Sequence, residues 1–338
     1  MSKVSRRDFL KMTAGTTALL ASGLTPAKAE AAAVLPPEAV GILYDATLCI
    51  GCKACMVKCK EYNSQPGGAL YQEGRGIPYE LPATAPIWDA PTTLSDKTVN
   101  LITAHRQGSG LNKDQAEEGF SFAKHHCMHC LDPACVSVCP VAAFIKDPKT
   151  GVVSYRKDRC IGCRYCQVAC PFSIPKFEWS SASPQLRKCQ LCHHRYPEGG
   201  YAACCEFCPT GASIFGRVTD LRQEAKRRLA LEPGSEYAFP IQRVDSERTL
   251  TRPVSRYLDH LYGLNEAGGT QYMLLAGVPF DLLGFNPRIT DESYSVLTWQ
   301  YIAKVPALIA VLLAAGTASY HFTHRRQHDS GRDDQAKG

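Results

Sequence analysis

The chain has 338 residues, a formal net charge of +6 and 17 cysteines. This length accommodates one large or two ordinary domains, and the modest charge, without a basic stripe interleaved with aromatic residues, argues against nucleic acid as a partner. Seventeen cysteines are too many for an ordinary intracellular enzyme and leave three chemistries: disulfide frameworks, zinc sites and iron–sulfur clusters.

The N-terminus carries the parts of a twin-arginine export signal in the correct order. The pair Arg6-Arg7 is followed by Phe9-Leu10-Lys11, then by a mildly apolar run and the small-residue sequence Ala27-Lys28-Ala29. A basic amphipathic N-terminus would explain the arginines alone but not this ordered combination. The pattern therefore predicts a signal peptide over residues 1–29, removed after Ala29, that delivers the rest of the chain to the periplasm.

The cysteines fall into four groups along the chain. The first and third groups have the spacing C-x2-C-x2-C-x3-C, and the fourth contains a doublet of adjacent cysteines. The groups are Cys49, Cys52, Cys55 and Cys59; Cys127, Cys130, Cys135 and Cys139; Cys160, Cys163, Cys166 and Cys170; and Cys189, Cys192, Cys204, Cys205 and Cys208.

This spacing is typical of bacterial ferredoxins, which hold [4Fe–4S] clusters. Three thiolates on one short loop reach three corners of a cube, and the fourth comes from elsewhere, usually from the last cysteine of a partner motif. Gly51 and Gly162 suit the close approach of the backbone to the cube. Several simultaneous disulfides are disfavoured by cysteines two residues apart, and zinc commonly takes well-separated C-x2-C pairs, so both alternatives fit less well.

The linking segments indicate which groups belong together. Residues 143–146 and 151–155 are predicted to form a β-hairpin that joins groups two and three. The segment after group four resembles the segment after group two, and Tyr44 and Tyr155 each stand five residues before the first cysteine of their group. Group four is therefore expected to join group one. The two predicted units are residues 127–170 and residues 41–59 with 189–217.

With the fourth ligand crossed within each unit, sixteen cysteines are assigned to four [4Fe–4S] clusters. Cluster A takes Cys49, Cys52, Cys55 and Cys208; cluster B takes Cys189, Cys192, Cys204 and Cys59; cluster C takes Cys127, Cys130, Cys135 and Cys170; cluster D takes Cys160, Cys163, Cys166 and Cys139. The C-x3-C spacing from Cys204 to Cys208 matches the end of every other group. Cys204 is therefore the expected ligand, and Cys205 is expected to be a small buried filler.

Other side chains near the cysteines are given lesser roles. Four cations adjoin ligands and would either raise cluster potentials or be solvated loop charges: Lys53, Lys58, Arg164 and Lys188. Five histidines are expected to be loop residues, because cysteines already fill the ligand positions: His125, His126, His129, His193 and His194.

The predicted cluster region covers residues 30–235 and ends in a helix. The segment 219–234 predicts a helix that is capped by Thr219 or Asp220 and ended by Pro233-Gly234, with its basic run on a solvated face. Residues 236–296 carry no chemical motif and are expected to be a periplasmic extension, which either covers the cluster domain or reaches a partner.

The C-terminal region predicts a transmembrane anchor over residues 297–324 and a cytoplasmic tail over residues 325–338. Residues 305–322 contain no Asp, Glu, Lys or Arg, and the helix from Tyr301 to Phe322 would be about 33 Å long, enough to cross a bilayer core. A buried core helix is the alternative. His324, Arg325 and Arg326 follow the span, which places that end in the cytoplasm.

The four groups in this arrangement resemble the four-cluster, ferredoxin-like subunits of membrane-bound bacterial oxidoreductases, over nearly everything from Gly41 to the anchor. The segments that begin at Gly108, Lys146 and Glu224 are similar to the electron-transfer subunit of the hydrogenase 2 type, as is the combination of twin-arginine signal and single anchor. The expected fold class is α+β, with two ferredoxin-like double-cluster units built from short β-hairpins and helices, and one C-terminal transmembrane helix.

The resemblance implies an electron-transfer subunit at the periplasmic face of the inner membrane, with no catalytic site of its own. Its four [4Fe–4S] clusters would carry electrons from the small and large subunits of a [NiFe] hydrogenase to an integral membrane subunit that reduces quinone. The iron–sulfur subunit of a periplasmic formate dehydrogenase or another molybdoenzyme is the alternative within this class. An exported structural protein, held by metal ions or disulfides and without a redox role, is the alternative from another class.

Overall fold

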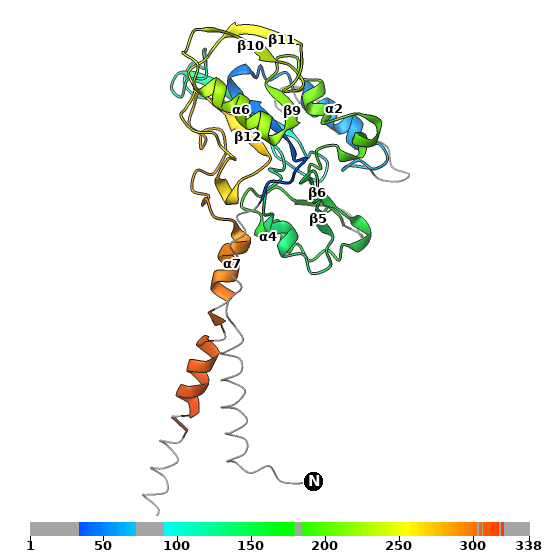
Figure 1. The fold of residues 1–338 in the computed structure, drawn as a ribbon, viewed down its shortest axis with the longest axis vertical. Coiled ribbons are helices and arrows are strands. Elements are labelled where there is room, and N and C mark those ends of the chain that lie inside the picture. The colour runs from blue at the N-terminus through cyan, green and yellow to red at the C-terminus, as the bar shows by residue number, and fades with distance from the viewer. Residues whose placement is uncertain are drawn as a thin grey trace, which may run out of the picture. The chain divides into compact units, whose positions relative to one another are not determined.

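The protein is described by a computed structural model, shown in Figure 1. The structure describes residues 34–71, 91–179, 184–302, 304–305, 307–317 and 319–320. The predicted signal peptide and cytoplasmic tail lie outside these residues. One compact unit spans Ala32–Ser295, and the described residues from Val296 onward belong to a second unit.

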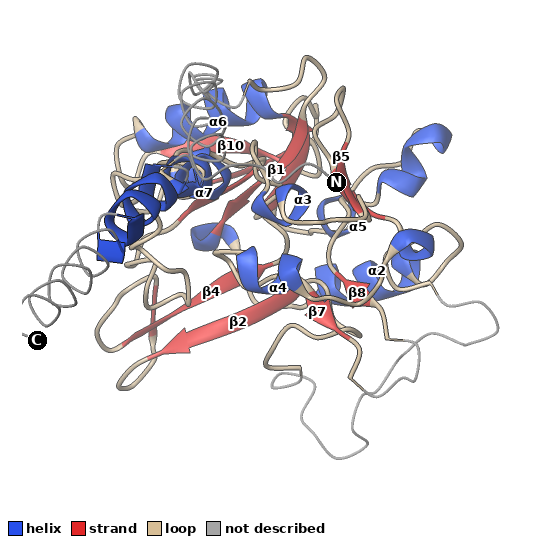
Figure 2. Ribbon diagram, turned by 90° about the horizontal axis from the view of Figure 1, so that it is seen from below, coloured by secondary structure: helices blue, strands red, loops and turns tan. Residues whose placement is uncertain are grey.

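The larger unit is a mixture of short strands and short helices (Figure 2), so the α+β class is correct. The strands are β1 Val40–Asp45, β2 Leu101–Arg106, β3 Asn112–Lys113, β4 Gly119–His125, β5 Phe144–Lys146, β6 Val153–Tyr155, β7 Lys176–Phe177, β8 Leu186–Arg187, β9 Ser213–Arg217, β10 Glu236–Pro240, β11 Thr249–Pro253 and β12 Tyr272–Leu275. The helices are α2 Ala54–Asn63, α3 Ala134–Ser137, α4 Tyr165–Ala169, α5 Ala203–Glu206, α6 Val218–Leu229 and α7 Tyr294–Ile302, with the 3-10 helices η1 Ala46–Leu48, η2 Lys157–Arg159, η3 His193–Glu198 and η4 Glu266–Gly268.

A three-stranded sheet has the order β12-β1-β9, with β1 parallel to β12 and antiparallel to β9. Residues of β1 alternate between two apolar clusters. Ile42 and Tyr44 belong to the larger core, whereas Leu43 belongs to a cluster that contains Val218 and Leu221 of α6. This period of two is expected for a strand that is buried on both faces.

The hairpin predicted between cysteine groups two and three is present, because β5 and β6 pair antiparallel. Strands β1 and β9 pair in the same way from the two ends of the cysteine-rich region. Each pair is accompanied by two contacting helices, α3 with α4 and α2 with α5. The pairing of β1 with β9 brings cysteine group four to cysteine group one.

The segment 236–296 contributes structure that its sequence did not indicate. It supplies the β10-β11 hairpin and the strand β12, whose Leu274 lies opposite Tyr44. The hydroxyl of Tyr272 donates to the backbone oxygen of Lys124 in β4 at 2.7 Å. This segment is therefore part of the core beside the cysteine-rich region.

Two details of the predicted helix over 219–234 are wrong. Helix α6 begins at Val218, and its N-cap residue is Arg217, which makes no side-chain capping bond. The cap is not needed because β9 leads directly into the helix and the N–H of Val218 bonds to the oxygen of Ala39 at 2.9 Å. The basic run is also not wholly solvated, since the side chain of Arg228 is fully buried.

The transmembrane anchor predicted over residues 297–324 is not found. Within the described part of the chain, no helix has both the length and the apolar character that crossing a membrane requires. Helix α7 has 9 residues, and residues 307–317 of the predicted span are also helical. Residues 303, 306, 318 and 321–324 of the predicted span lie outside the described residues.

Candidate iron–sulfur cluster sites

Site A contains the four cysteines predicted for cluster A. Cys49 follows η1, Cys52 and Cys55 lie around the start of α2, and Cys208 follows α5. All four line one pocket. Burial raises the pKa of the Cys55 thiol, and the nearby sulfurs of Cys204, Cys49 and Cys208 raise it further.

Site B contains the four cysteines predicted for cluster B. Cys59 comes from α2, Cys204 from α5, and Cys189 and Cys192 from the loop before η3. Burial raises the pKa of the Cys59 thiol, and the sulfurs of Cys192, Cys189 and Cys204 act in the same direction. The amide nitrogen of Asn63 lies 3.6 Å from the sulfur of Cys59 and 3.3 Å from that of Cys192, so one side chain donates to two of these cysteines.

Site C contains the four cysteines predicted for cluster C. Cys127 and Cys130 follow β4, Cys135 lies in α3, and Cys170 follows α4. Burial raises the pKa of the Cys130 thiol, and the next causes are the sulfurs of Cys170, Cys127 and Cys135. The other three members of the site are thus the neighbours of Cys130.

Site D contains the four cysteines predicted for cluster D. Cys160 follows η2, Cys163 and Cys166 lie around the start of α4, and Cys139 follows α3. Burial raises the pKa of Cys166 to about 12, and the sulfurs of Cys139, Cys160 and Cys163 contribute to the increase. The structure therefore brings together each of the four sets that the sequence grouped.

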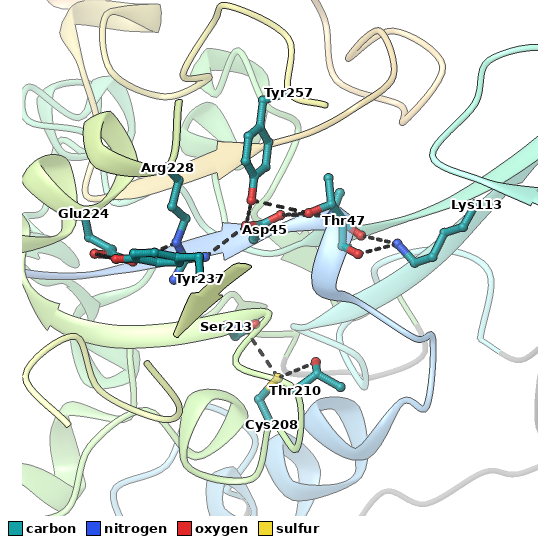
Figure 3. A network of polar contacts seen from close by, with 11 residues as sticks. Asp45, Thr47, Lys113, Cys208, Thr210, Ser213, Glu224, Arg228, Tyr237 and Tyr257 are labelled. Atoms are coloured by element: carbon teal, nitrogen blue, oxygen red, sulfur yellow. Dashed lines mark hydrogen bonds and ion pairs between the residues drawn. The ribbon is translucent and has the colours of Figure 1, made fainter. Parts of the chain in front are cut away.

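Backbone N–H groups donate to cysteine sulfur in these loops, in three of them from the residue two positions after the cysteine. The N–S distances are 3.4 Å from Gly51 to Cys49, 3.4 Å from Gly162 to Cys160, 3.4 Å from Leu191 to Cys189, 3.1 Å from Ala143 to Cys139 and 3.4 Å from Ser213 to Cys208 (Figure 3). Hydrogen bonds of this kind stabilise negative charge on ligand sulfur and tune cluster potentials.

Two glycines allow the loops of sites A and D to turn. Gly51 and Gly162 have φ values of +69° and +73°, a region that side chains rarely adopt. A Cβ atom at Gly51 would also lie 2.4 Å from the ring of Phe122, whereas the nearest atom to a Cβ at Gly162 would be 3.9 Å away. The two loops share a conformation, but only the loop of site A is tightly packed.

The donor sets fit [4Fe–4S] clusters. None of the seventeen cysteines, all within the described residues, forms a disulfide. Burial raises the pKa of Cys135 to about 12 and that of Cys170 to about 11, so without a cation these thiols are neutral. Iron would supply the positive charge that converts four converging thiols into ligands.

No cluster of three or more His, Cys, Asp or Glu within the described residues is tight enough for one metal ion. The four ligands of a [4Fe–4S] cube bind four different irons, so they need not approach one another as closely as the ligands of a single ion.

Cys204 and Cys205 differ in their electrostatic surroundings, although both are buried. A hydrogen bond from the Cys205 thiol, together with the Lys124 ammonium, lowers the pKa of Cys204 to about 6. Burial raises the pKa of Cys205. The pKa of Cys204 is thus shifted down and that of Cys205 up, the directions expected if Cys204 is the ligand and Cys205 donates a hydrogen bond to it.

Lys124, which the sequence reasoning missed, lies among these sulfurs. It is fully buried on β4. Burial alone would lower the pKa of Lys124, but the sulfurs of Cys204, Cys205 and Cys55 raise it above its usual range, so the group is an ammonium. A single lysine within a strand segment carries no sequence signal that would have identified it.

The cations that the sequence did single out have different surroundings. Lys188 is buried and donates to the backbone oxygens of Val153 and Cys189. The guanidinium of Arg164 lies 4.8 Å from the centre of the Trp179 ring. Lys58 pairs with Glu61 at 2.8 Å near the surface. The description of solvated loop charges therefore does not hold for Lys188.

The five histidines are not all loop residues, as the sequence predicted, because His125 ends β4 and His193 and His194 begin η3. Burial lowers the pKa of all five, most strongly for His126 and His129, which favours neutral imidazoles. Nδ1 of His129 accepts the N–H of Val153 at 3.0 Å, and Nε2 of His194 lies 3.1 Å from the oxygen of Tyr62. These contacts link the ligand loops to neighbouring backbone.

The four sites adjoin one another in the order A, B, C, D. The adjoining sulfurs are those of Cys55 and Cys204 for A and B, Cys189 and Cys127 for B and C, and Cys135 and Cys166 for C and D. Cys127 and Cys189 also pack in one apolar cluster with Ile174. The contact between B and C connects the two double-cluster units.

Comparison with known proteins gives matches along the chain. Residues 119–218 match the family model of the 4Fe-4S dicluster domain. Residues 3–23 match the family model of the twin-arginine translocation pathway signal sequence, which confirms the predicted export signal.

The chain is similar to several curated proteins. It is 41% identical to the hydrogenase-2 operon protein HybA of Escherichia coli O157:H7, over 98% of this chain and 99% of that protein. It has the same identity and coverage with the protein of that name from Shigella flexneri. It is 33% identical to the iron-sulfur subunit of the nitrate-inducible formate dehydrogenase of Escherichia coli K12, over 66% of this chain and 67% of that subunit.

Proposed function

This chain belongs to the family of the hydrogenase-2 operon protein HybA, and on that premise we propose that it is the iron–sulfur electron-transfer subunit of a hydrogenase-2 complex. Identity of 41% over nearly the whole length of both chains supports this assignment. The chain itself carries out no catalysis in this proposal. Its role is to hold redox centres at fixed positions between two partners.

The observation that carries the proposal is the convergence of sixteen cysteines into four sets of four. Sites A, B, C and D are the proposed binding sites of four [4Fe–4S] clusters, and the ligands of each cluster are the four cysteines predicted for it from the sequence. A bound [4Fe–4S] cluster accepts and releases one electron at a potential that its surroundings set. The chain supplies thiolates, backbone donors to sulfur and rigid spacing between the sites.

The order of the sites supports a single path through the chain. Sites B and C have a neighbour on each side, whereas A and D are the ends of the series. One cysteine at each end is exposed, Cys52 in site A and Cys163 in site D. Electrons are therefore proposed to enter at one end site and to leave at the other.

Exposed apolar side chains lie beside both end sites. Ile50 and Val57 are exposed beside site A, and Val168 and Trp179 are exposed beside site D. Isolated exposed apolar residues are common, but their presence beside both end sites favours contact with other subunits. We propose that the [NiFe] hydrogenase small and large subunits provide one partner surface, and an integral membrane subunit that reduces quinone provides the other.

The proposed location is the periplasmic face of the inner membrane. The twin-arginine signal supports export. A C-terminal anchor over residues 297–324 is kept as a proposal, supported by the uncharged run 305–322. Among its described side chains, Leu308, Leu312 and Leu313 are exposed.

The iron–sulfur subunit of a formate dehydrogenase is the second candidate. It is favoured by 33% identity to such a subunit over about two thirds of both chains. Both candidates use the same four sites, so they differ only in the partner that supplies electrons.

The test is reduction of the clusters in the purified membrane complex by hydrogen and, separately, by formate. The proposal expects loss of visible iron–sulfur absorbance under hydrogen and no change with formate. Reduction by formate alone would assign the chain to the second candidate. A chain without iron–sulfur absorbance would reject both.

A further inference from the structure

Lys124 occupies a position between sites A and B. Its side chain is fully buried, and its Nζ atom lies 3.0 Å from Oγ of Ser213 in β9. The backbone N–H of the same serine donates to the sulfur of Cys208 in site A (Figure 3). On the other side, the ammonium of Lys124 interacts with the sulfur of Cys204 in site B. One cation thus adjoins both sites.

Sulfur surrounds this ammonium where a buried lysine would usually need a carboxylate. Burying an unpaired ammonium is costly, so such groups are generally paired. Within the described residues no Asp or Glu forms an ion pair with Lys124, and its electrostatic partners are Cys204, Cys205, Cys55 and Tyr272. The charge is therefore compensated by cysteine sulfur, two of these cysteines being proposed cluster ligands.

A cation in this position has a definite effect on electron transfer. Reduction adds one negative charge to a [4Fe–4S] cluster, and a fixed ammonium in a low-dielectric interior favours the more negative state. The thiol of Cys205 acts on the same sulfur, since it donates to Cys204. Both groups stabilise the reduced form and so raise the reduction potential.

We propose that Lys124, assisted by Cys205, sets the potential of the site B cluster and, more weakly, that of site A. This proposal rests on the proposed function, since it requires clusters at these sites. Lys124 is not a ligand; it acts on the cluster through the ligand sulfur and is therefore a positioning residue. The consequence is that the potentials of the A–B pair depend on a cation that the C–D pair does not share.

Lys188 offers a matched control in the other unit. It is also buried, and it influences Cys135 and Cys170 of site C. Lys188 precedes the first cysteine of group four, just as Lys124 precedes the first cysteine of group two. Lys124 thus leads into the unit of sites C and D but acts on sites A and B, and Lys188 leads into the unit of sites A and B but acts on site C. Replacing Lys124 removes a buried cation from sites A and B, whereas replacing Lys188 removes one from site C.

The experiment is a redox titration of the purified full-length chain, followed by electron paramagnetic resonance, with iron content measured on the same samples. Lys124→Met is expected to shift one reductive transition to a more negative potential. The expected size is about tenfold in the reduction equilibrium constant, or about 59 mV for one electron. Lys124→Arg, which keeps the charge, should titrate like the unaltered chain.

Two further variants identify the site. Cys205→Ala should shift the same transition as Lys124→Met by a smaller amount, and Lys188→Met should shift a different one. If Lys124→Met loses iron, Lys124→Gln replaces it, because glutamine fills a similar volume and can still donate to sulfur. Should the Lys124→Gln variant also lose iron, the Cys205→Ala shift alone decides.

The outcomes are distinguishable from failure of the proposed function. Iron and a resonance signal in the unaltered reduced chain establish that clusters are present. Given these, superimposable titrations of the unaltered chain and its Lys124→Met variant at equal iron content would overturn the proposal. A shift shared equally by all four transitions would overturn it as well, because that is the effect of a general structural change.

Discussion

The guanidinium of Arg228 donates from Nη1 to Oδ2 of Asp45 at 2.9 Å, and both side chains are fully buried. Nε of the same arginine lies 2.8 Å from Oε1 of Glu224. The hydroxyl of Tyr257 donates to Oδ2 of Asp45 at 2.7 Å (Figure 3). Asp45 also accepts the N–H of Thr47 in η1. The arginine on α6 thus fixes the turn that leads into Cys49 of site A.

Replacing Arg228 by Met should therefore destabilise the chain. The substitution leaves the buried carboxylate of Asp45 without its cation and removes one of the two arginines that pair with Glu224. Breaking a buried pair in this way costs about 3–5 kcal/mol. The measurement is the temperature at which visible cluster absorbance is lost on heating. The exposed Lys226 on the same helix is the control, and Lys226→Met should change stability by no more than about 0.5 kcal/mol. Equal effects of the two substitutions would contradict this account.

The two adjacent cysteines predict opposite results in an iron assay. Cys204→Ala removes a proposed ligand of site B and should lower the iron content by about four per chain. Cys205→Ala should leave the iron content unchanged, because that thiol only donates to its neighbour. Iron is measured per chain after purification without oxygen. If Cys205→Ala lost the iron and Cys204→Ala kept it, the assignment of the two residues would have to be exchanged.

Alanine substitutions at the turn glycines of sites A and D distinguish the effect of backbone strain from that of steric crowding. Gly162→Ala should cost about 1–2 kcal/mol, since alanine at a positive φ is strained even with room for its methyl group. Gly51→Ala should cost more, because the methyl group would also meet the ring of Phe122. Retention of iron during incubation with a chelator compares the two variants. Faster loss from Gly162→Ala than from Gly51→Ala would be inconsistent with the packing described.

The exposed residues near site D predict a contact with a partner. Val168 is 85% exposed, and Val168→Glu would place a charge in the proposed apolar interface, which desolvation disfavours. Hydrogen-dependent reduction of quinone by the complex should slow several-fold while the iron content of the chain stays constant. Val34, which is 82% exposed, provides the control substitution Val34→Glu. An unchanged rate for Val168→Glu would remove that residue from the proposed contact.

The cysteine sets could be predicted because their chemistry is local. Ligand spacing such as Cys49, Cys52 and Cys55 is set by the geometry of one short loop. The joining of groups one and four could also be predicted, since the sequence around β9 repeats that around β5, and both strands form antiparallel pairs. Repetition within the chain therefore carried information about long-range pairing.

The remaining features depend on contacts between distant segments. Strand β12 pairs with β1 across more than two hundred residues, and its sequence carries no motif that names this partner. Lys124 and Arg228 look like ordinary charged residues of a strand and a helix, and only the fold shows that both are buried. The predicted anchor relied on an uncharged run and on the basic residues that follow it, and such local features do not determine where a helix begins or ends.

The most direct test of the central claim is the iron and acid-labile sulfide content of the purified full-length chain. Four [4Fe–4S] clusters on sixteen cysteines predict about sixteen irons and about sixteen sulfides per chain. About eight of each would mean that only one double-cluster unit is filled. Zinc in place of iron and sulfide would contradict the account, because the four sites would then have no redox role.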